Sequence, residues 1–148
     1  MIVQAEQRAS RYRCGLILVG VAAGALSLAA AGCDGPLYAP QDAAPNLRGP
    51  LEGLLTQCYN ACDNDVRCFG GGRNRCYDAC DRSVSDVARD ARGTGDERSC
   101  VEAWRDLERC VSNLSCGELD RFYEGSGSYP CRSAEDRADD RCSRYRWY

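Results

Sequence analysis

The chain of 148 residues contains neither histidine nor lysine, and its only methionine is the first residue. Without histidine, the Ser-His-Asp and Cys-His arrangements of nucleophilic catalysis are excluded, and so are zinc sites with histidine ligands. All 19 basic residues are therefore arginine, which we interpret as codon bias in a GC-rich bacterial genome. Because no other catalytic constellation occurs, the sequence predicts a protein that is not an enzyme.

The chain contains no long run of residues that carry the same charge. The net charge is −3, and loss of residues 1–32, which hold three arginines and one glutamate, changes it to −5. A mildly acidic protein without a basic stripe is a poor partner for nucleic acid.

Asp63 and Asp65 have calcium-loop spacing, but the glycine and the final glutamate of an EF-hand are missing. We therefore expect no metal and no other cofactor.

Long apolar runs are also scarce, and the longest stretches from Leu16 to Cys33. With an apolar middle of about 16 residues, it is short for a membrane span, which needs roughly 20. Arg8, Arg11 and Arg13 precede this run, and small residues end it. A basic start, an apolar middle and a small-residue exit are typical of an export signal.

The residues Ala30-Ala31-Gly32-Cys33 at the end of the run resemble the lipobox of bacterial lipoprotein precursors. This resemblance implies a signal peptide over 1–32, cleavage before Cys33, and a membrane anchor made by lipid on Cys33. The chain departs from the pattern at Ala30, where a lipobox most often has leucine. Ala29 to Ala31 also fits the A-x-A site of ordinary signal peptidase, and cleavage after Ala31 would release a secreted protein.

Cysteine parity favours the lipoprotein interpretation. Of the 12 cysteines, Cys14 leaves with the signal, and those between Cys58 and Cys142 are even in number. All of these can pair, which leaves Cys33 as the odd one, available for a thioether to lipid. So many cysteines in a small exported domain predict a disulfide framework, because such a domain buries too little apolar surface to fold without one.

The chain after the signal divides into a tether and a domain. Residues 33–49, with Pro36, Pro40 and Pro45, are rich in proline and alanine and form a flexible tether. Residues 50–148 show helical periodicity throughout, so we predict an all-α domain of disulfide-stapled helical hairpins with about five short helices. The first helix is expected to start at Pro50, and the second to end before Gly93. Capping boxes at Ser99 with Glu102 and at Ser115 with Glu118 are expected to start the third and fourth helices. The fourth helix should stop at Gly125, and the last should cover 133–144.

The cysteine spacing predicts nested pairs. Residues four apart share a helix face, so two antiparallel helices carrying C-x3-C can be bridged twice. The same nesting applies to the later cysteines and leaves one pair to link the two hairpins. The hypothesis is therefore Cys58–Cys80, Cys62–Cys76, Cys100–Cys142, Cys110–Cys131 and Cys68–Cys116. From Cys58 to Cys80 the twin C-x3-C pattern resembles α-hairpinin peptides and the small intermembrane-space chaperones, which implies a stapled hairpin and no particular function.

Two groups of residues are candidates for binding. The first group surrounds the loop Gly70-Gly71-Gly72 and could present a basic side chain as a protease inhibitor does; it consists of Arg67, Arg73 and Arg75. The second group is aromatic and could contact a partner or a membrane interface; it consists of the C-terminal residues Tyr145, Trp147 and Tyr148.

The sequence thus predicts a lipid-anchored binding or structural module, exported to the periplasm or cell surface. Its expected partners are the membrane, through Cys33, and an unidentified protein or other component of the envelope. A secreted inhibitor or effector that presents the arginine loop is the alternative, and a thiol or metal carrier comes third.

Overall fold

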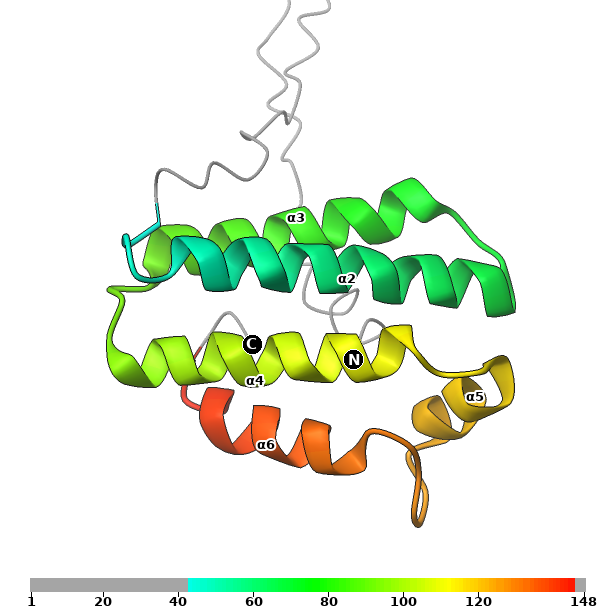
Figure 1. The fold of residues 1–148 in the computed structure, drawn as a ribbon. Coiled ribbons are helices and arrows are strands. Elements are labelled where there is room, and N and C mark those ends of the chain that lie inside the picture. Colours follow the sequence, from blue (N-terminus) through cyan, green and yellow to red (C-terminus); the bar gives the residue numbers. More distant parts are fainter. Residues whose placement is uncertain (1–42, 146–148) are drawn as a thin grey trace, which may run out of the picture. The chain divides into compact units, whose positions relative to one another are not determined.

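The computed structural model describes residues 43–145, and this part of the chain contains five α-helices and no strand (Figure 1). The helices are α2 (Arg48–Phe69), α3 (Arg73–Asp90), α4 (Gly95–Ser112), α5 (Cys116–Glu124) and α6 (Arg132–Cys142). The predicted all-α, disulfide-stapled class is confirmed.

The helices form two antiparallel hairpins that lie side by side. In Figure 1, α3 returns along α2, and α6 returns along α4, with the short α5 at the turn between α4 and α6. The helix α2 packs against both α3 and α4, and runs in the same direction as α4. The contact between α2 and α4 therefore joins the two hairpins.

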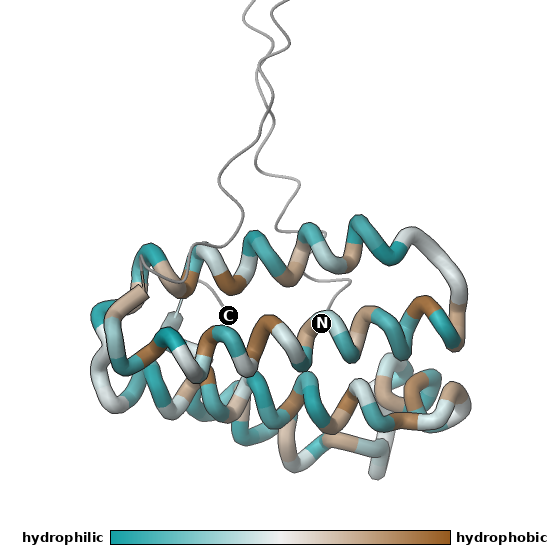
Figure 2. The backbone as a smooth tube through the Cα atoms, turned by 45° about the horizontal axis from the view of Figure 1, so that its top comes forward, coloured by the Kyte–Doolittle hydropathy of each residue, from teal (hydrophilic) through white to brown (hydrophobic). Residues whose placement is uncertain are grey.

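Two apolar clusters make up the core. Each helix contributes a narrow apolar stripe, so the brown segments in Figure 2 recur along the helices and do not form continuous runs. The first cluster joins the start of α2 to α3 and α4, and consists of Ala43, Leu47, Leu51, Leu54, Val84, Val87, Ala88, Ala91 and Val101. The second joins α4, α5 and α6 to the middle of α2, and consists of Ala61, Leu107, Val111, Leu114, Leu119, Phe122, Ala134 and Ala138.

Five disulfides join the helices in the nested arrangement expected from the spacing. Within the first hairpin the pairs are Cys58–Cys80 and Cys62–Cys76, and within the second they are Cys100–Cys142 and Cys110–Cys131. The fifth, Cys68–Cys116, joins the last turn of α2 to the first residue of α5 and so links the hairpins.

The folded domain begins earlier than the sequence analysis predicts. Residues 43–49 were assigned to the tether, but Ala43 and Leu47 are buried in the first cluster, and α2 starts at Arg48 and not at Pro50. Leu47 continues the stripe of Leu51 and Leu54 by one more turn. The Asn46 side chain donates a 2.6 Å hydrogen bond to the Gly93 carbonyl, which ties this segment to the turn between α3 and α4.

The helix ends are set by capping residues. The predicted box at Ser99 and Glu102 is wrong, because α4 begins one turn earlier. Thr94 is its N-cap, and the Thr94 N–H donates to the Glu97 carboxylate at 2.7 Å. The box at Ser115 and Glu118 is confirmed, as is the stop of α5 at Gly125, which adopts a left-handed conformation. The last helix covers 132–142 and not 133–144.

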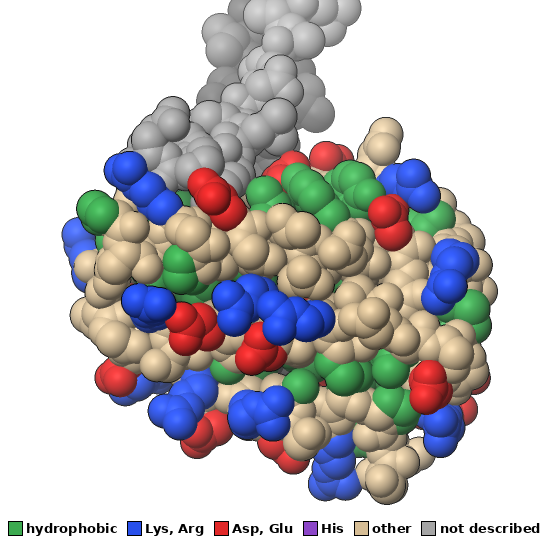
Figure 3. All heavy atoms as spheres, in the orientation of Figure 1, with side chains coloured by type: hydrophobic (Ala, Val, Ile, Leu, Met, Phe, Trp, Pro, Cys, Tyr) green, Lys and Arg blue, Asp and Glu red, His purple; other side chains and the backbone are tan. Residues whose placement is uncertain are grey.

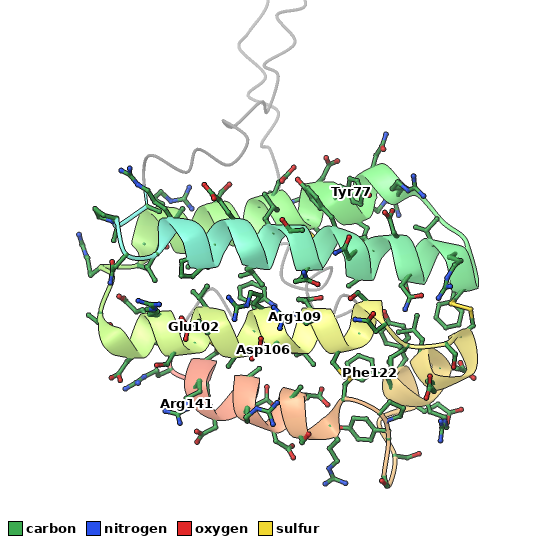
Figure 4. All side chains as sticks on the ribbon, in the orientation of Figure 1. Tyr77, Glu102, Asp106, Arg109, Phe122 and Arg141 are labelled. Carbon is green, nitrogen blue, oxygen red and sulfur yellow. A yellow bond between two sulfur atoms is a disulfide. The ribbon has the colours of Figure 1, made fainter. Side chains whose placement is uncertain are left out.

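The outer surfaces of α4 and α6 carry ion pairs. Arginines and carboxylates interleave over these helices in Figure 3, and Glu102, Asp106, Arg109 and Arg141 lie on this face in Figure 4. Among the pairs, Arg98 Nε lies 2.8 Å from Glu102 and Arg109 Nη1 lies 3.6 Å from Asp106. Both pairs are solvent-exposed, and such pairs each contribute about 0–1 kcal/mol. They are a solvated surface rather than a site.

Candidate functional site

Two tyrosine–aspartate hydrogen bonds connect α2 and α3 beside the disulfides. The Tyr77 hydroxyl, on α3 in Figure 4, donates to Asp63 of α2 at 2.8 Å. In the reciprocal direction, the Tyr59 hydroxyl of α2 donates to Asp81 of α3. The two rings stack on each other, with centroids 4.3 Å apart and planes at 28°. The pairs and the stack reinforce the contact that Cys58–Cys80 and Cys62–Cys76 make covalent.

A short repeat in the sequence explains this symmetry. The pattern C-Y-x-A-C-D occurs at residues 58–63 and again at 76–81. Because α2 and α3 are antiparallel, the first cysteine of each copy pairs with the second of the other. The tyrosine of each copy likewise reaches the aspartate of the other. The sequence analysis used only the cysteines, so it missed these pairs, and the repeat was the signal that identifies them.

Tyr59 gives the first hairpin a dependence on alkaline pH. Its burial, the hydrogen bond to Asp81 and the negative charge of that carboxylate raise the pKa of Tyr59 from 10.0 to about 12. Since the unfolded chain ionises this tyrosine at lower pH, its contribution to stability is complete below pH 10 and is lost as the pH rises from 10 to about 12. We expect Tyr59→Phe to lose less stability over that interval than the unaltered protein, as measured by urea unfolding. Equal losses would contradict the assignment.

Two of the three arginines expected to present a basic loop make contacts within the domain. Arg67 donates to Asn64 and, at 3.3 Å, to the Leu114 carbonyl, so it supports the connection between α4 and α5. Arg73 Nε lies 2.9 Å from Asp63. Arg75, on the first turn of α3, is solvent-exposed, as is Phe69. The structure thus brings the three arginines to one end of the first hairpin, at the end of α2 and the start of α3.

An open polar groove lies between α2 and the C-terminal end of α4. Its volume is about 430 Å³, and every side chain that lines it is polar. The lining residues are Gln57, Asn60, Asp63, Asn64, Arg67, Ser112 and Asn113. Figure 4 shows nitrogen- and oxygen-tipped side chains between the two helices at this end. Among the predicted site residues that the structure describes, Arg67 is the one that lines this groove.

Asn64 forms the base of the groove. It is buried, and its amide donates to the Val111 carbonyl at 2.9 Å and to the Leu114 carbonyl at 3.0 Å. The Val111 carbonyl belongs to the last turn of α4, and the Leu114 carbonyl follows the C-cap residue Asn113, in the connection to α5. Asn64 therefore serves as a capping residue supplied by another helix, which no local sequence pattern indicates.

The aspartates on either side of Asn64 also have structural partners. Asp63 accepts from Tyr77, and Asp65 accepts from the Tyr123 hydroxyl of α5 at 3.0 Å. Burial, together with the charge and the hydrogen bond of Asp65, raises the pKa of Tyr123. Within residues 43–145 no group of three or more carboxylates and cysteines is arranged to hold a metal ion.

Two of the predicted binding elements can be compared with the structure only in part. Tyr145 is half-buried, and the Arg144 guanidinium lies over its ring at 5.3 Å. Trp147, Tyr148 and Cys33 lie outside the described residues. The roles assigned to these three residues remain predictions.

Comparison with known proteins identifies no relative. No protein-family model, curated protein or solved structure matches the chain. Among the described helices, none has both the length and the apolar character needed to cross a membrane. The function therefore has to be argued from the residues themselves.

Proposed function

We propose that the protein is a lipid-anchored, exported module that acts by binding or structural support and not by catalysis. The observation that carries this proposal is the use of cysteines. Every cysteine from Cys58 to Cys142 is paired with another of the same domain. Cys14 belongs to the predicted signal, so Cys33 is the cysteine that remains, at the site where a lipobox would place the lipid.

The disulfide framework supports export. Five disulfides are stable in an oxidising compartment, such as the periplasm or the cell surface, and are rare in a reducing cytoplasm. The same pairing leaves no thiol of the described domain for a thiol or metal carrier. The inhibitor alternative is less favoured, because one of its three arginines, Arg67, donates to Asn64 and to the Leu114 carbonyl within the domain.

Replacement of Cys33 tests the anchor. When the full precursor is made in a lipoprotein-processing bacterium fed with labelled fatty acid, we expect the label to enter the unaltered protein and to be absent from Cys33→Ser. The matched control is Cys14→Ser, which removes the other cysteine outside the domain and is expected to keep the label. Label in Cys33→Ser, or none in the unaltered protein, would contradict the proposed anchor.

A further inference from the structure

The groove between α2 and α4 has the size of a ligand site but an unusual lining. Small-molecule sites commonly measure about 300–1,000 Å³ and are mainly apolar. This groove, at about 430 Å³, is lined by residues whose side chains end in amide, hydroxyl, carboxylate or guanidinium groups. A ligand that fits it must gain its affinity from hydrogen bonds and not from burial of apolar surface.

The two charged side chains of the groove already have partners within the domain. The Asp63 carboxylate has Arg73 at 2.9 Å and accepts from Tyr77. The Arg67 guanidinium donates to the Asn64 side-chain oxygen and, at 3.3 Å, to the Leu114 carbonyl between α4 and α5. Neither group requires an oppositely charged ligand, so the groove is suited to a neutral one.

Uncompensated hydrogen-bonding groups remain on both sides of the groove. Gln57 and Asn60, one helical turn apart on α2, line the groove, and their side chains make no hydrogen bond within the described part of the chain. Across from them, the Asn113 side chain donates to the Arg109 carbonyl, which leaves its own amide oxygen as an acceptor. A primary amide offers two donors and one acceptor oxygen, and a hydroxyl group can both donate to it and accept from it.

The lining favours a glycan over a peptide. Bound peptides gain specificity from pockets for their side chains, and this groove has no apolar pocket. A sugar chain presents hydroxyl groups along its length, and its rings lose less conformational freedom on binding than a flexible peptide backbone does.

The surrounding structure holds the groove in one conformation. Asn64 fixes its base through two backbone carbonyls of the second hairpin. The α2 wall is tied to α3 by Cys58–Cys80 and Cys62–Cys76, and to α5 by Cys68–Cys116. A preorganised site loses little entropy when its ligand binds.

We propose that this groove binds a neutral, hydroxyl-rich glycan chain, with Gln57, Asn60 and Asn113 as its hydrogen-bonding residues. The inference deepens the proposed function and rests on it, because export would bring the domain to the polysaccharides of the envelope.

Side-chain amide NMR tests the proposal directly. The full-length ¹⁵N-labelled protein, purified in detergent from whole cells without a membrane-separation step, is titrated with neutral hexasaccharides of glucose and N-acetylglucosamine and with soluble cell-wall glycan strands. A neutral Gly-Ser peptide of similar length and heparin serve as competing ligand classes. We expect at least one neutral glycan to shift the amide signals of Gln57 and Asn60.

Variants then locate the binding. Gln57→Ala/Asn60→Ala is expected to weaken glycan binding at least about tenfold, because each lost hydrogen bond is worth up to about a factor of ten in affinity. The matched control, Asn74→Ala, removes an exposed amide of α3 outside the groove and is expected to bind like the unaltered protein. No response to any neutral glycan, binding of the peptide or heparin alone, or equal binding by the double variant would each overturn the proposal.

The mass of the same preparation separates the two proposals. An unlipidated protein that binds glycan through Gln57 and Asn60 would refute the anchor and leave the groove assignment standing. A lipidated protein without glycan binding would refute the groove assignment alone.

Discussion

Removal of both disulfides of the second hairpin, in the variant Cys100→Ala/Cys110→Ala/Cys131→Ala/Cys142→Ala, is expected to detach α6 from the domain. The buried side chains of α6 are small, namely Ala134, Ala138 and Cys142. With 11 residues, α6 is also shorter than the roughly 12–15 that an isolated helix needs to be even marginally stable. Each disulfide contributes about 2–4 kcal/mol to stability. Burial of the two small side chains of Ala134 and Ala138 stabilises the packed helix by less than the two disulfides do together.

The first hairpin provides the matched comparison. Cys58→Ala/Cys62→Ala/Cys76→Ala/Cys80→Ala also removes two nested disulfides, but α3 has 18 residues and buries Val84, Val87 and Ala88. Full burial of a valine is worth about 1.5 kcal/mol or more, so α3 is expected to stay packed on α2 although the domain is destabilised.

Hydrogen exchange of individual amides distinguishes the two outcomes. In the second-hairpin variant, the α6 amides are expected to exchange at close to the rate of an unfolded chain, while α2 and α4 keep their protection. In the first-hairpin variant, the α3 amides remain protected. Equal protection of α6 and α3 in the two variants would show that packing, and not the disulfides, holds α6.

Leu47→Ala is expected to cost about 2–5 kcal/mol in the free energy of unfolding, as for other fully buried leucines. Leu47 lies four residues after the first described residue, yet its side chain is completely buried in the cluster that also contains Leu51 and Val84. Its loss would leave a cavity at the junction of α2, α3 and α4, since all three contribute to the first cluster.

Urea unfolding of the full-length protein measures this cost. Glu52→Ala, at an exposed position one turn further along α2, serves as the control and is expected to change stability by less than about 0.5 kcal/mol. If Leu47→Ala lowered the free energy of unfolding by no more than the control, residues 43–49 would belong to the tether, as the sequence predicts.

The features that sequence analysis predicted well depend on spacing within a helix. The C-x3-C pairs, the glycine break after α2 and the box at Ser115 and Glu118 are each local patterns with one geometric consequence. Nested pairing followed once the helices were taken as antiparallel hairpins, and the structure contains the same five pairs.

The features it missed depend on contacts between distant segments. Leu47 was assigned to the tether because the proline- and alanine-rich residues before it show no apolar period, whereas its partners lie on α3 and α4. The box at Thr94 and Glu97 competes with one at Ser99 and Glu102, and only packing decides between them. Asn64 and the amide groove result from the parallel contact of α2 with α4, which no pattern within either helix encodes.

The measurement that tests the central claim most directly is the intact mass of the native protein from its own cell envelope, before and after reduction and alkylation. The account predicts a chain that starts at Cys33 and carries acyl groups, in which the cysteines from Cys58 to Cys142 are alkylated only after reduction. A chain that starts at Gly32 without lipid would contradict the anchor. Alkylation of those cysteines without reduction would contradict the disulfide framework on which the account rests.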